Sequence, residues 1–149
     1  MNRVIVESPY SAPNPTRSKI NEIYAEICLK DCILRGEAPF ASHLLYTRTF
    51  VLDDCDAEER KLGIEVGLSW YDVANLCAVY SDIGISKGMQ LGIERAKQKN
   101  VTVEYRSLLH DTSKFPVADI PMLLKDCMLN NYEFVWTCLR SGYSRGSKV

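Results

Sequence analysis

Two carboxylates and one histidine follow short apolar runs, at places where a strand would give way to a loop. Glu7 follows the β-branched run at residues 4–6, and Asp82 comes shortly after the apolar run at residues 76–80. A carboxylate in such a place can act as a base that activates water. His43 follows a third, shorter run, and its side chain could hydrogen-bond a ligand or carry a proton. A satisfied structural histidine is the alternative for His43.

A turn rich in glycine and serine follows the apolar run at residues 76–80. Gly84, Ser86 and Gly88 let the backbone approach a ligand closely. The helix expected from Ser86 presents unpaired N–H groups and the positive end of its dipole, where a phosphate can dock. The alternative is structural, because a strand-to-helix turn often needs glycine and a capping serine. Lys87 could pair with the same phosphate, as could Arg48, although solvated charge is the commoner role of either.

Alternating strands and helices must position these residues. Apolar runs predict strands at residues 4–6, 38–41, 76–80 and 101–105, and helical spacing predicts helices at residues 20–34, from Asp54 or Asp56 to about residue 72, and at 86–99. Gly36 is expected to end the first helix, and the second strand to feed a long loop. The apolar face of the second helix is expected to include Leu62, Ile64, Val66 and Leu68.

This alternation is typical of a parallel sheet with right-handed crossovers. We therefore predict an α/β fold, a three-layer sandwich around a flavodoxin- or Rossmann-like sheet of about four to five strands. Ligands of such sheets bind beyond the carboxyl ends of the strands, where the strand order reverses. Glu7 and Asp82 are accordingly expected to face one crevice. Tyr10 and Tyr46 could stack on a base or sugar there, although aromatic residues beside strands more often belong to the core.

The chain is expected to form one domain over residues 1–107, with an extension at residues 108–149 that packs on it. In the extension, residues 120–129 have a helical pattern, and residues 132–136 alternate like a strand. Residues 142–149 are expected to fray.

Composition restricts the class of protein. Of the 149 residues, 46% are hydrophobic and 25% charged, as in ordinary globular proteins. A net charge of −1 means that the chain lacks the excess positive charge that binds nucleic acid or an anionic membrane. No apolar run is long enough to span a bilayer. We expect a cytoplasmic protein, of a bacterium or an infected host cell. Its six cysteines are expected to be thiols, and neither a metal nor a cofactor is expected.

Residues 80–96, YSDIGISKGMQLGIERA, resemble the catalytic segment of the nucleoside 2-deoxyribosyltransferase-like superfamily, which includes deoxynucleoside monophosphate N-glycosidases. That segment reads roughly Gly-Thr-x-x-Glu-x-Gly-x-Ala, and its Glu is the nucleophile. The residues that align with it are Gly88, Met89, Gly92, Ile93 and Ala96, and Gly92 falls on the Glu. The resemblance covers about residues 3–106, including VIVESPY, GEAPFASHLLYT and WYDVANLCAVYSD. PFASHLLYT and GISxGMQxGI also resemble a subgroup of small uncharacterised bacterial and phage proteins.

The resemblance implies a ligand class more firmly than a reaction. In active relatives the Glu attacks the anomeric carbon and forms a covalent glycosyl intermediate, which Gly92 cannot do. Glu94 lies about 200° further round the helix and cannot replace it. Glycine inside a helix costs about 1 kcal/mol relative to alanine, so Gly92 either allows tight packing on the sheet or leaves room for a ligand.

Three hypotheses remain open. One is a nucleoside or nucleotide binding protein that sequesters or senses its ligand. Another is an active N-glycosidase or deoxyribosyltransferase in which Glu7 or Asp82 activates water, as in inverting glycosidases. A purely structural subunit is the third and weakest. Relatives assemble as dimers or higher oligomers with shared pockets, so the resemblance also implies a homo-oligomer.

The loops and the resemblance together predict a set of site residues. The candidate catalytic residues are Glu7 and Asp82. The candidate ligand-binding residues are Ser8, Pro9, Tyr10, His43, Tyr46, Asp72, Ser81, Gly84, Ile85, Ser86, Lys87, Gly88, Met89 and Gly92.

Overall fold

Four parallel strands and the helices between them form the part of the chain that the computed structural model describes, residues 1–12, 15–48 and 50–108. The strands are β1 (Arg3–Glu7), β2 (Ala38–Phe40), β3 (Leu76–Tyr80) and β4 (Thr102–Arg106), in the sheet order β2-β1-β3-β4. The helices are α1 (Pro15–Leu34), α2 (Ser42–Leu45), α3 (Ala57–Ser69) and α4 (Lys87–Gln98), with the 3-10 helix η1 (Trp70–Asp72) after α3. The predicted α/β fold is confirmed. The strand order reverses between β1 and β3.

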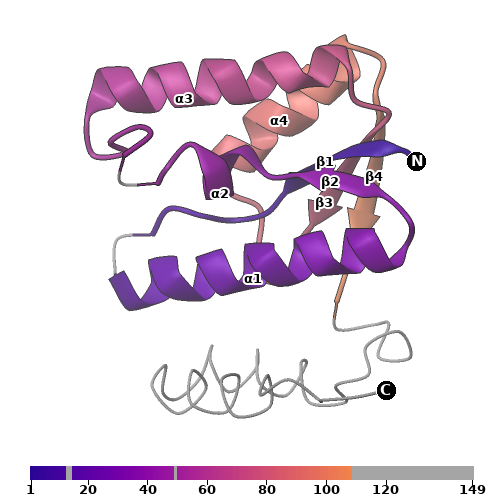
Figure 1. The fold of residues 1–149 in the computed structure, drawn as a ribbon, viewed down its shortest axis with the longest axis horizontal. Helices are drawn as coiled ribbons and strands as arrows, with labels where there is room; N and C mark the ends of the chain where they lie inside the picture. Colours follow the sequence, from indigo (N-terminus) through magenta and orange to yellow (C-terminus); the bar gives the residue numbers. More distant parts are fainter. Residues whose placement is uncertain (13–14, 49, 109–149) are drawn as a thin grey trace.

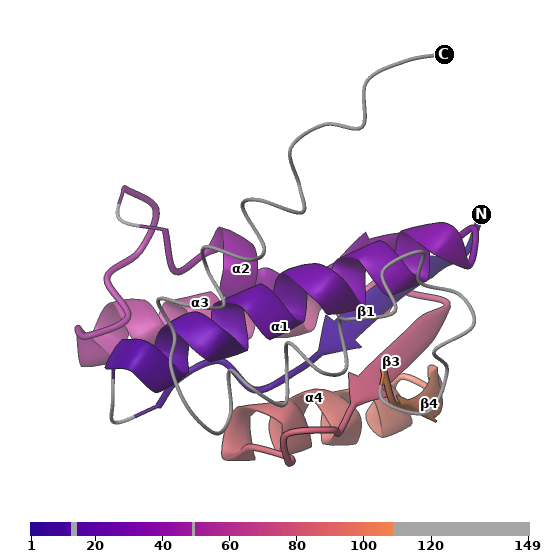
Figure 2. The same cartoon turned by 90° about the horizontal axis from the view of Figure 1, so that it is seen from below.

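The sheet lies between two helical layers. Figure 1 shows α1 on one face and α3 and α4 on the other. In the sheet, α1 packs against β1 and β2, and Figure 2 shows α4 beside β3 and β4. Alternate side chains of a strand point to opposite faces. Val4 and Val6 accordingly lie in the core toward α1, whereas Ile5 lies in the core toward α4. Glu7 is in phase with Ile5, so its side chain is on the α4 face.

Local signals end and begin the helices as predicted. Gly36 has a φ of 77°, and its N–H donates to the Ile33 carbonyl after the end of α1. Asp56 caps α3 by accepting hydrogen bonds from the backbone of residues 58 and 59. The hydroxyl of Ser86 caps α4 by accepting from the N–H of Met89 at 3.3 Å.

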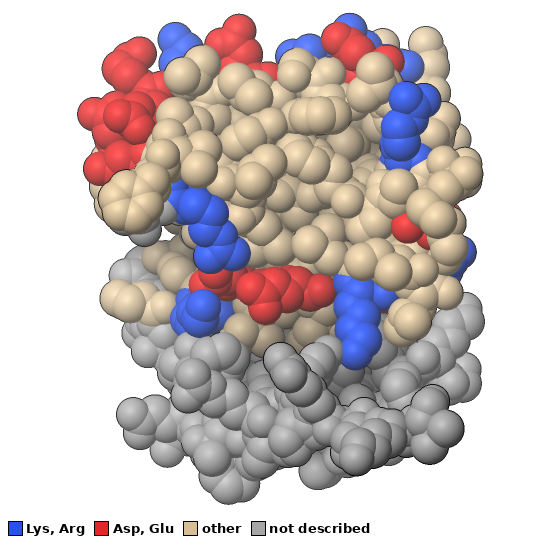
Figure 3. Space-filling view, in the orientation of Figure 1, with Lys and Arg blue, Asp and Glu red and all other residues tan. Residues whose placement is uncertain are grey.

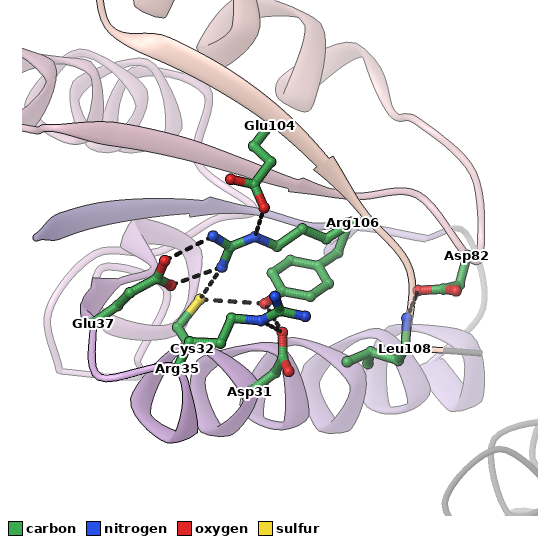
Figure 4. A network of polar contacts seen from close by, with 9 residues as sticks. Asp31, Cys32, Arg35, Glu37, Asp82, Glu104, Arg106 and Leu108 are labelled. Atoms are coloured by element: carbon green, nitrogen blue, oxygen red, sulfur yellow. Dashed lines mark hydrogen bonds and ion pairs between the residues drawn. The ribbon is translucent and has the colours of Figure 1, made fainter. Parts of the chain in front are cut away.

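A buried polar network ties β4 to the other elements on the α1 face (Figure 4). The guanidinium of Arg106 makes two hydrogen bonds to the carboxylate of Glu37, at 2.7 and 2.8 Å, and one to Glu104 at 2.9 Å. Beside it, the hydroxyl of Tyr80 donates to Asp31 at 2.5 Å. These contacts satisfy buried polar groups, so this face is held together internally.

Two sequence-based expectations are wrong. The segment after β2 is not only a loop, because α2 begins two residues after β2 and carries His43. The apolar face expected on α3 forms only at Leu68, which packs against the core on the α4 side, whereas Leu62 is 50% exposed and Val66 37% exposed. Residues at every second position point around all sides of a helix. The face of α3 toward α2 has glycine instead, and a Cβ at Gly67 would lie 2.9 Å from the Cβ of Ser42.

The helix expected at residues 120–129, the strand expected at 132–136 and the fraying expected at 142–149 lie outside the described residues. Within the described part of the chain, no helix has both the length and the apolar character needed to cross a membrane.

Candidate functional site

A pocket of about 360 Å³ opens at the carboxyl end of β1, between α2, α3 and the start of α4. Nine of the predicted site residues line it: Glu7, Ser8, Tyr10, His43, Tyr46, Ser86, Lys87, Gly88 and Met89. We call this the central pocket. It lies at the edge of the sheet where the topology rule predicts a ligand. On the face seen in Figure 3, charged side chains gather along the margins of a broad uncharged area.

The carboxyl group of Glu7 lies directly over Gly92. A Cβ built on Gly92 would lie 1.9 Å from Glu7 Oε1, so only glycine leaves room for the carboxyl in this position. Tyr71, which is 2% exposed, donates a hydrogen bond from its hydroxyl to Glu7 Oε1 at 2.7 Å. The room beside Gly92 is therefore occupied by a side chain from β1.

The surroundings of Glu7 disfavour its ionised form. Burial raises the pKa of this carboxyl to about 7, and the hydrogen bond from Tyr71 opposes that rise only in part. Close to neutral pH the group consequently exists in both forms. Such a carboxyl can donate or accept a proton without a large change in pH.

A second polar group lies on the α2 side of the central pocket. Ser8 Oγ and His43 Nε2 are 2.9 Å apart, and the rings of Tyr10 and His43 have centroids 5.6 Å apart. The hydroxyl of Thr47 lies 2.8 Å from the Tyr10 hydroxyl. Burial lowers the pKa of His43 to about 4, so its ring is neutral at pH 7. A neutral imidazole offers one donor and one acceptor.

The start of α4 forms a third wall of the central pocket. Lys87 is exposed there, and within the described residues it has no ion pair. Gly88 has open space around it, since a Cβ would meet only Ser86 Oγ at 3.8 Å. Gly84 has a φ of 100° and does not line the pocket, so its glycine is explained by the turn.

Asp82 lies on the other face of the sheet. Its Oδ2 accepts a hydrogen bond from the Tyr24 hydroxyl at 2.5 Å and from the Leu108 N–H at 3.0 Å, and its Oδ1 accepts from the Ser107 hydroxyl. Figure 4 shows Asp82 joined to the backbone of Leu108, on the same side of the sheet as α1. The expectation that Glu7 and Asp82 share a crevice is wrong. Asp82 follows Tyr80 by two residues on the α1 side, whereas Glu7 points toward α4.

Other predicted site residues also lie outside the lining. Asp72 is paired with Lys99 at 2.5 Å on the surface, and Arg48 with Glu22 at 2.5 Å. The remaining predicted residues that do not line the central pocket are Pro9, Ser81, Ile85 and Gly92, and Gly92 is covered by the Glu7 carboxyl.

Tyr71 is the partner of Glu7 and was not among the predicted site residues. It lies beside the predicted Asp72, but its contact with Glu7 spans 64 residues, and no local pattern signals it. The described His, Cys, Asp and Glu residues form no group of three or more that could hold a metal ion.

The comparisons with known proteins give one family. A family model described as "Domain of unknown function (DUF7768)" matches residues 2–106, a span that includes every described residue of the central pocket. No match is found among curated proteins. Because the matched residues make up more than half of the 149 in the chain, the protein belongs to the family described as Domain of unknown function (DUF7768).

Proposed function

We propose that the protein binds a nucleoside or nucleotide in the central pocket, with Glu7 facing the sugar. The observation that carries the proposal is the position of the Glu7 carboxyl, whose Oε1 lies where a Cβ of residue 92 would be, 1.9 Å away. The resemblance to deoxyribosyltransferase-like proteins gives that place to a carboxylate carried by the helix. Here a carboxylate from β1 reaches it instead.

The rest of the central pocket suits the same ligand class. A volume of about 360 Å³ is in the range of small-molecule sites. Lys87 and the N-terminus of α4 offer positive charge and N–H groups to a phosphate. Tyr10 offers an aromatic ring, and the neutral His43 offers polar ring atoms to a base or sugar.

A second candidate function is cleavage of an N-glycosidic bond. The pKa of Glu7, raised to about 7, favours it, because a group that titrates near neutral pH is suited to proton transfer. The ionised carboxyl would take a proton from a water molecule as that water attacks the anomeric carbon. The bond to the base breaks in the same step, the departing base takes a proton from the solvent, and Glu7 then returns the proton it received to the solvent. This function makes the protein a hydrolase, whereas the first makes it a sequestering or sensing protein.

One experiment tests both functions. The protein is incubated at pH 7 with a panel of nucleosides, nucleoside 5′-monophosphates and ribosylated signalling molecules, and the free and denatured fractions are then analysed. Intact ligand released only on denaturation supports binding, and free base supports cleavage. Glu7→Gln should lose either property. The matched control Glu94→Gln changes an exposed carboxylate of α4 and should keep both. A folded protein that binds no member of the panel would overturn the proposal.

We also propose that the protein assembles as a homo-oligomer through α3. Leu62, Val66 and Trp70 repeat at intervals of four residues and are 50%, 37% and 42% exposed. Two exposed apolar side chains of α3 and the adjoining Trp70 of η1 favour a protein partner, and a second copy offers the same surface. Light scattering should give a multimeric mass that Val66→Lys reduces. A monomeric wild-type protein at micromolar concentration would contradict this assembly.

A cytoplasmic location remains part of the proposal, supported by the free thiols of the four described cysteines.

A further inference from the structure

We propose that Tyr71 is a positioning residue, which holds the Glu7 carboxyl over Gly92 as the acceptor for a hydroxyl-bearing ligand, so that binding of this ligand expels the carboxyl proton. The inference rests on the proposed function and adds to it the regulation of the same site by pH. On this inference, a nucleoside sugar binds the protein when Glu7 is ionised and does not bind when Glu7 is protonated.

The contacts of Tyr71 define its role. Its hydroxyl lies 2.7 Å from Glu7 Oε1 and 3.3 Å from Cys77 Sγ, and it would lie 2.9 Å from a Cβ at Gly92. The phenol is 2% exposed and cannot swing into water without unpacking from the α4-side core. It therefore holds the Glu7 carboxyl in one place.

The hydrogen bonds of Glu7 leave capacity for a ligand. An ionised carboxylate has about four acceptor positions. Among the described residues, Tyr71 donates a hydrogen bond to Glu7, and Glu7 lines the central pocket. A pair of sugar hydroxyls can supply further donors, which stabilise the ionised form. A protonated carboxyl would instead donate a hydrogen bond to an acceptor atom of the ligand.

No group that faces Glu7 from the surrounding described elements carries a charge that would compete with a ligand for its proton. From η1 it faces Tyr71, from β3 Cys77, and from α4 the bare backbone of Gly92. Burial raises the pKa of Cys77 to about 12, so its thiol stays neutral. From α2, the neutral His43 pairs with Ser8. The charged groups that line the rest of the central pocket are Asp54, Glu59, Arg60 and Lys87, of which Arg60 pairs with Asp54 at 2.5 Å.

The pH dependence follows from these contacts. With a pKa of about 7, the carboxyl is ionised in about one tenth of molecules at pH 6 and about nine tenths at pH 8. The apparent affinity for a ligand that binds one form scales with the fraction of that form. Affinity should therefore rise about tenfold from pH 6 to pH 8.

Nucleosides are suitable probes, because they lack the phosphate group, which titrates in the same range. We would measure binding of adenosine, guanosine, cytidine and uridine by calorimetry from pH 5.5 to pH 8.5, in buffers of differing ionisation enthalpy. The expected result is the tenfold rise together with release of about half a proton per ligand at pH 7. An affinity that falls or stays level as pH rises would overturn the inference.

The variant Tyr71→Phe tests the positioning role. Loss of the hydroxyl donor should move the Glu7 midpoint upward, which carbon NMR of labelled glutamate detects without any ligand, with Glu7→Gln for assignment. Affinity should fall about tenfold at pH 7 and recover at higher pH, whereas a merely structural effect would be equal at all pH values. Tyr80→Phe is the matched control, because it removes a buried hydroxyl on the opposite face that bonds Asp31.

The outcomes separate the two proposals. An unchanged Glu7 midpoint in Tyr71→Phe overturns the inference and leaves the proposed function standing. A shifted midpoint with no binding of any nucleoside supports the positioning role of Tyr71 and overturns the ligand that both proposals require. If Tyr71→Phe fails to fold, the wild-type affinity profile decides the inference alone.

Discussion

Glu7 and Asp82 lie near the carboxyl ends of the neighbouring strands β1 and β3, on opposite faces of one sheet. Asp82 accepts hydrogen bonds from Tyr24, Ser107 and Leu108, and it fixes the chain where it leaves β4. Glu7 accepts one from Tyr71 and lines a pocket. A buried carboxylate with its donors in place stabilises the fold, while one with spare acceptor capacity costs stability and is available to a ligand. The difference favours Glu7 over Asp82 as the carboxylate of the proposed site.

The largest effect is expected for Asp82→Ala. It leaves the Tyr24 hydroxyl, the Ser107 hydroxyl and the Leu108 N–H without their acceptor, so the free energy of unfolding should fall by about 4 kcal/mol. Urea denaturation measures the change. The control Asp72→Ala removes an exposed ion pair to Lys99 and should cost less than about 1 kcal/mol. Equal losses in the two variants would remove the distinction between a structural and a surface carboxylate.

Glu7→Gln should raise the free energy of unfolding near neutral pH, whereas Asp82→Ala lowers it. The pKa of Glu7 is raised from 4.5 to about 7 in the folded state, so the unfolded chain loses this proton first as pH rises. Folding stability therefore falls between pH 4.5 and pH 7, by about 3 kcal/mol at pH 8. The neutral glutamine avoids that cost, and the variant should be more stable than wild type at pH 8 and equal to it at pH 4. Destabilisation at pH 8 would show that the carboxylate supports the fold.

His43 carries the reverse pH dependence on the same side of the sheet. Its pKa falls from 6.5 to about 4 on folding, so the unfolded chain takes up this proton first as pH decreases. The wild-type protein should lose about 2 kcal/mol of stability from this group between pH 7 and pH 5. His43→Gln should lack this loss, as thermal unfolding at the two pH values would reveal. An identical acid sensitivity in the variant would mean that His43 is not buried in its neutral form.

The smallest change in stability is expected for Gly92→Ala. Alanine favours the helix by about 1 kcal/mol, but its Cβ takes the place of Glu7 Oε1. The carboxyl should move toward the solvent of the central pocket, with a lower pKa and loss of ligand binding. The Tyr71 hydroxyl, which would lie 2.9 Å from the new Cβ, must shift as well, so the gain in helix propensity is offset and the free energy of unfolding changes by about 1 kcal/mol. Gly88→Ala, which meets only Ser86 Oγ at 3.8 Å, should leave the Glu7 titration unchanged. If both variants titrate like wild type, Glu7 does not occupy the room over Gly92.

Several features were predictable because their signals are local. Apolar runs indicated all four described strands, and Gly36, Asp56 and Ser86 marked helix ends through their own backbone or capping chemistry. The position of the pocket followed from the strand pattern and one topological rule. His43 and Lys87 were found in this way.

Other features depend on how the elements pack together. Asp82 lies beyond the end of β3 and turns toward Tyr24 of α1, whereas Glu7 in β1 is in phase with Ile5 and points toward α4. The glycines of α3, rather than its apolar residues, face α2, because close approach of the two helices needs small side chains. Tyr71 meets Glu7 only through packing of η1 beside β1.

The sequence by itself determined the α/β architecture, the edge of the sheet that holds the pocket, and the absence of a carboxylate at residue 92. Those properties follow from periodicity, capping and residue type, which act over a few neighbouring positions. Only the tertiary structure decided what fills the space over Gly92. Glu7, Tyr71 and Gly92 come from three separate elements, and the pKa of the carboxyl depends on the burial that their packing creates.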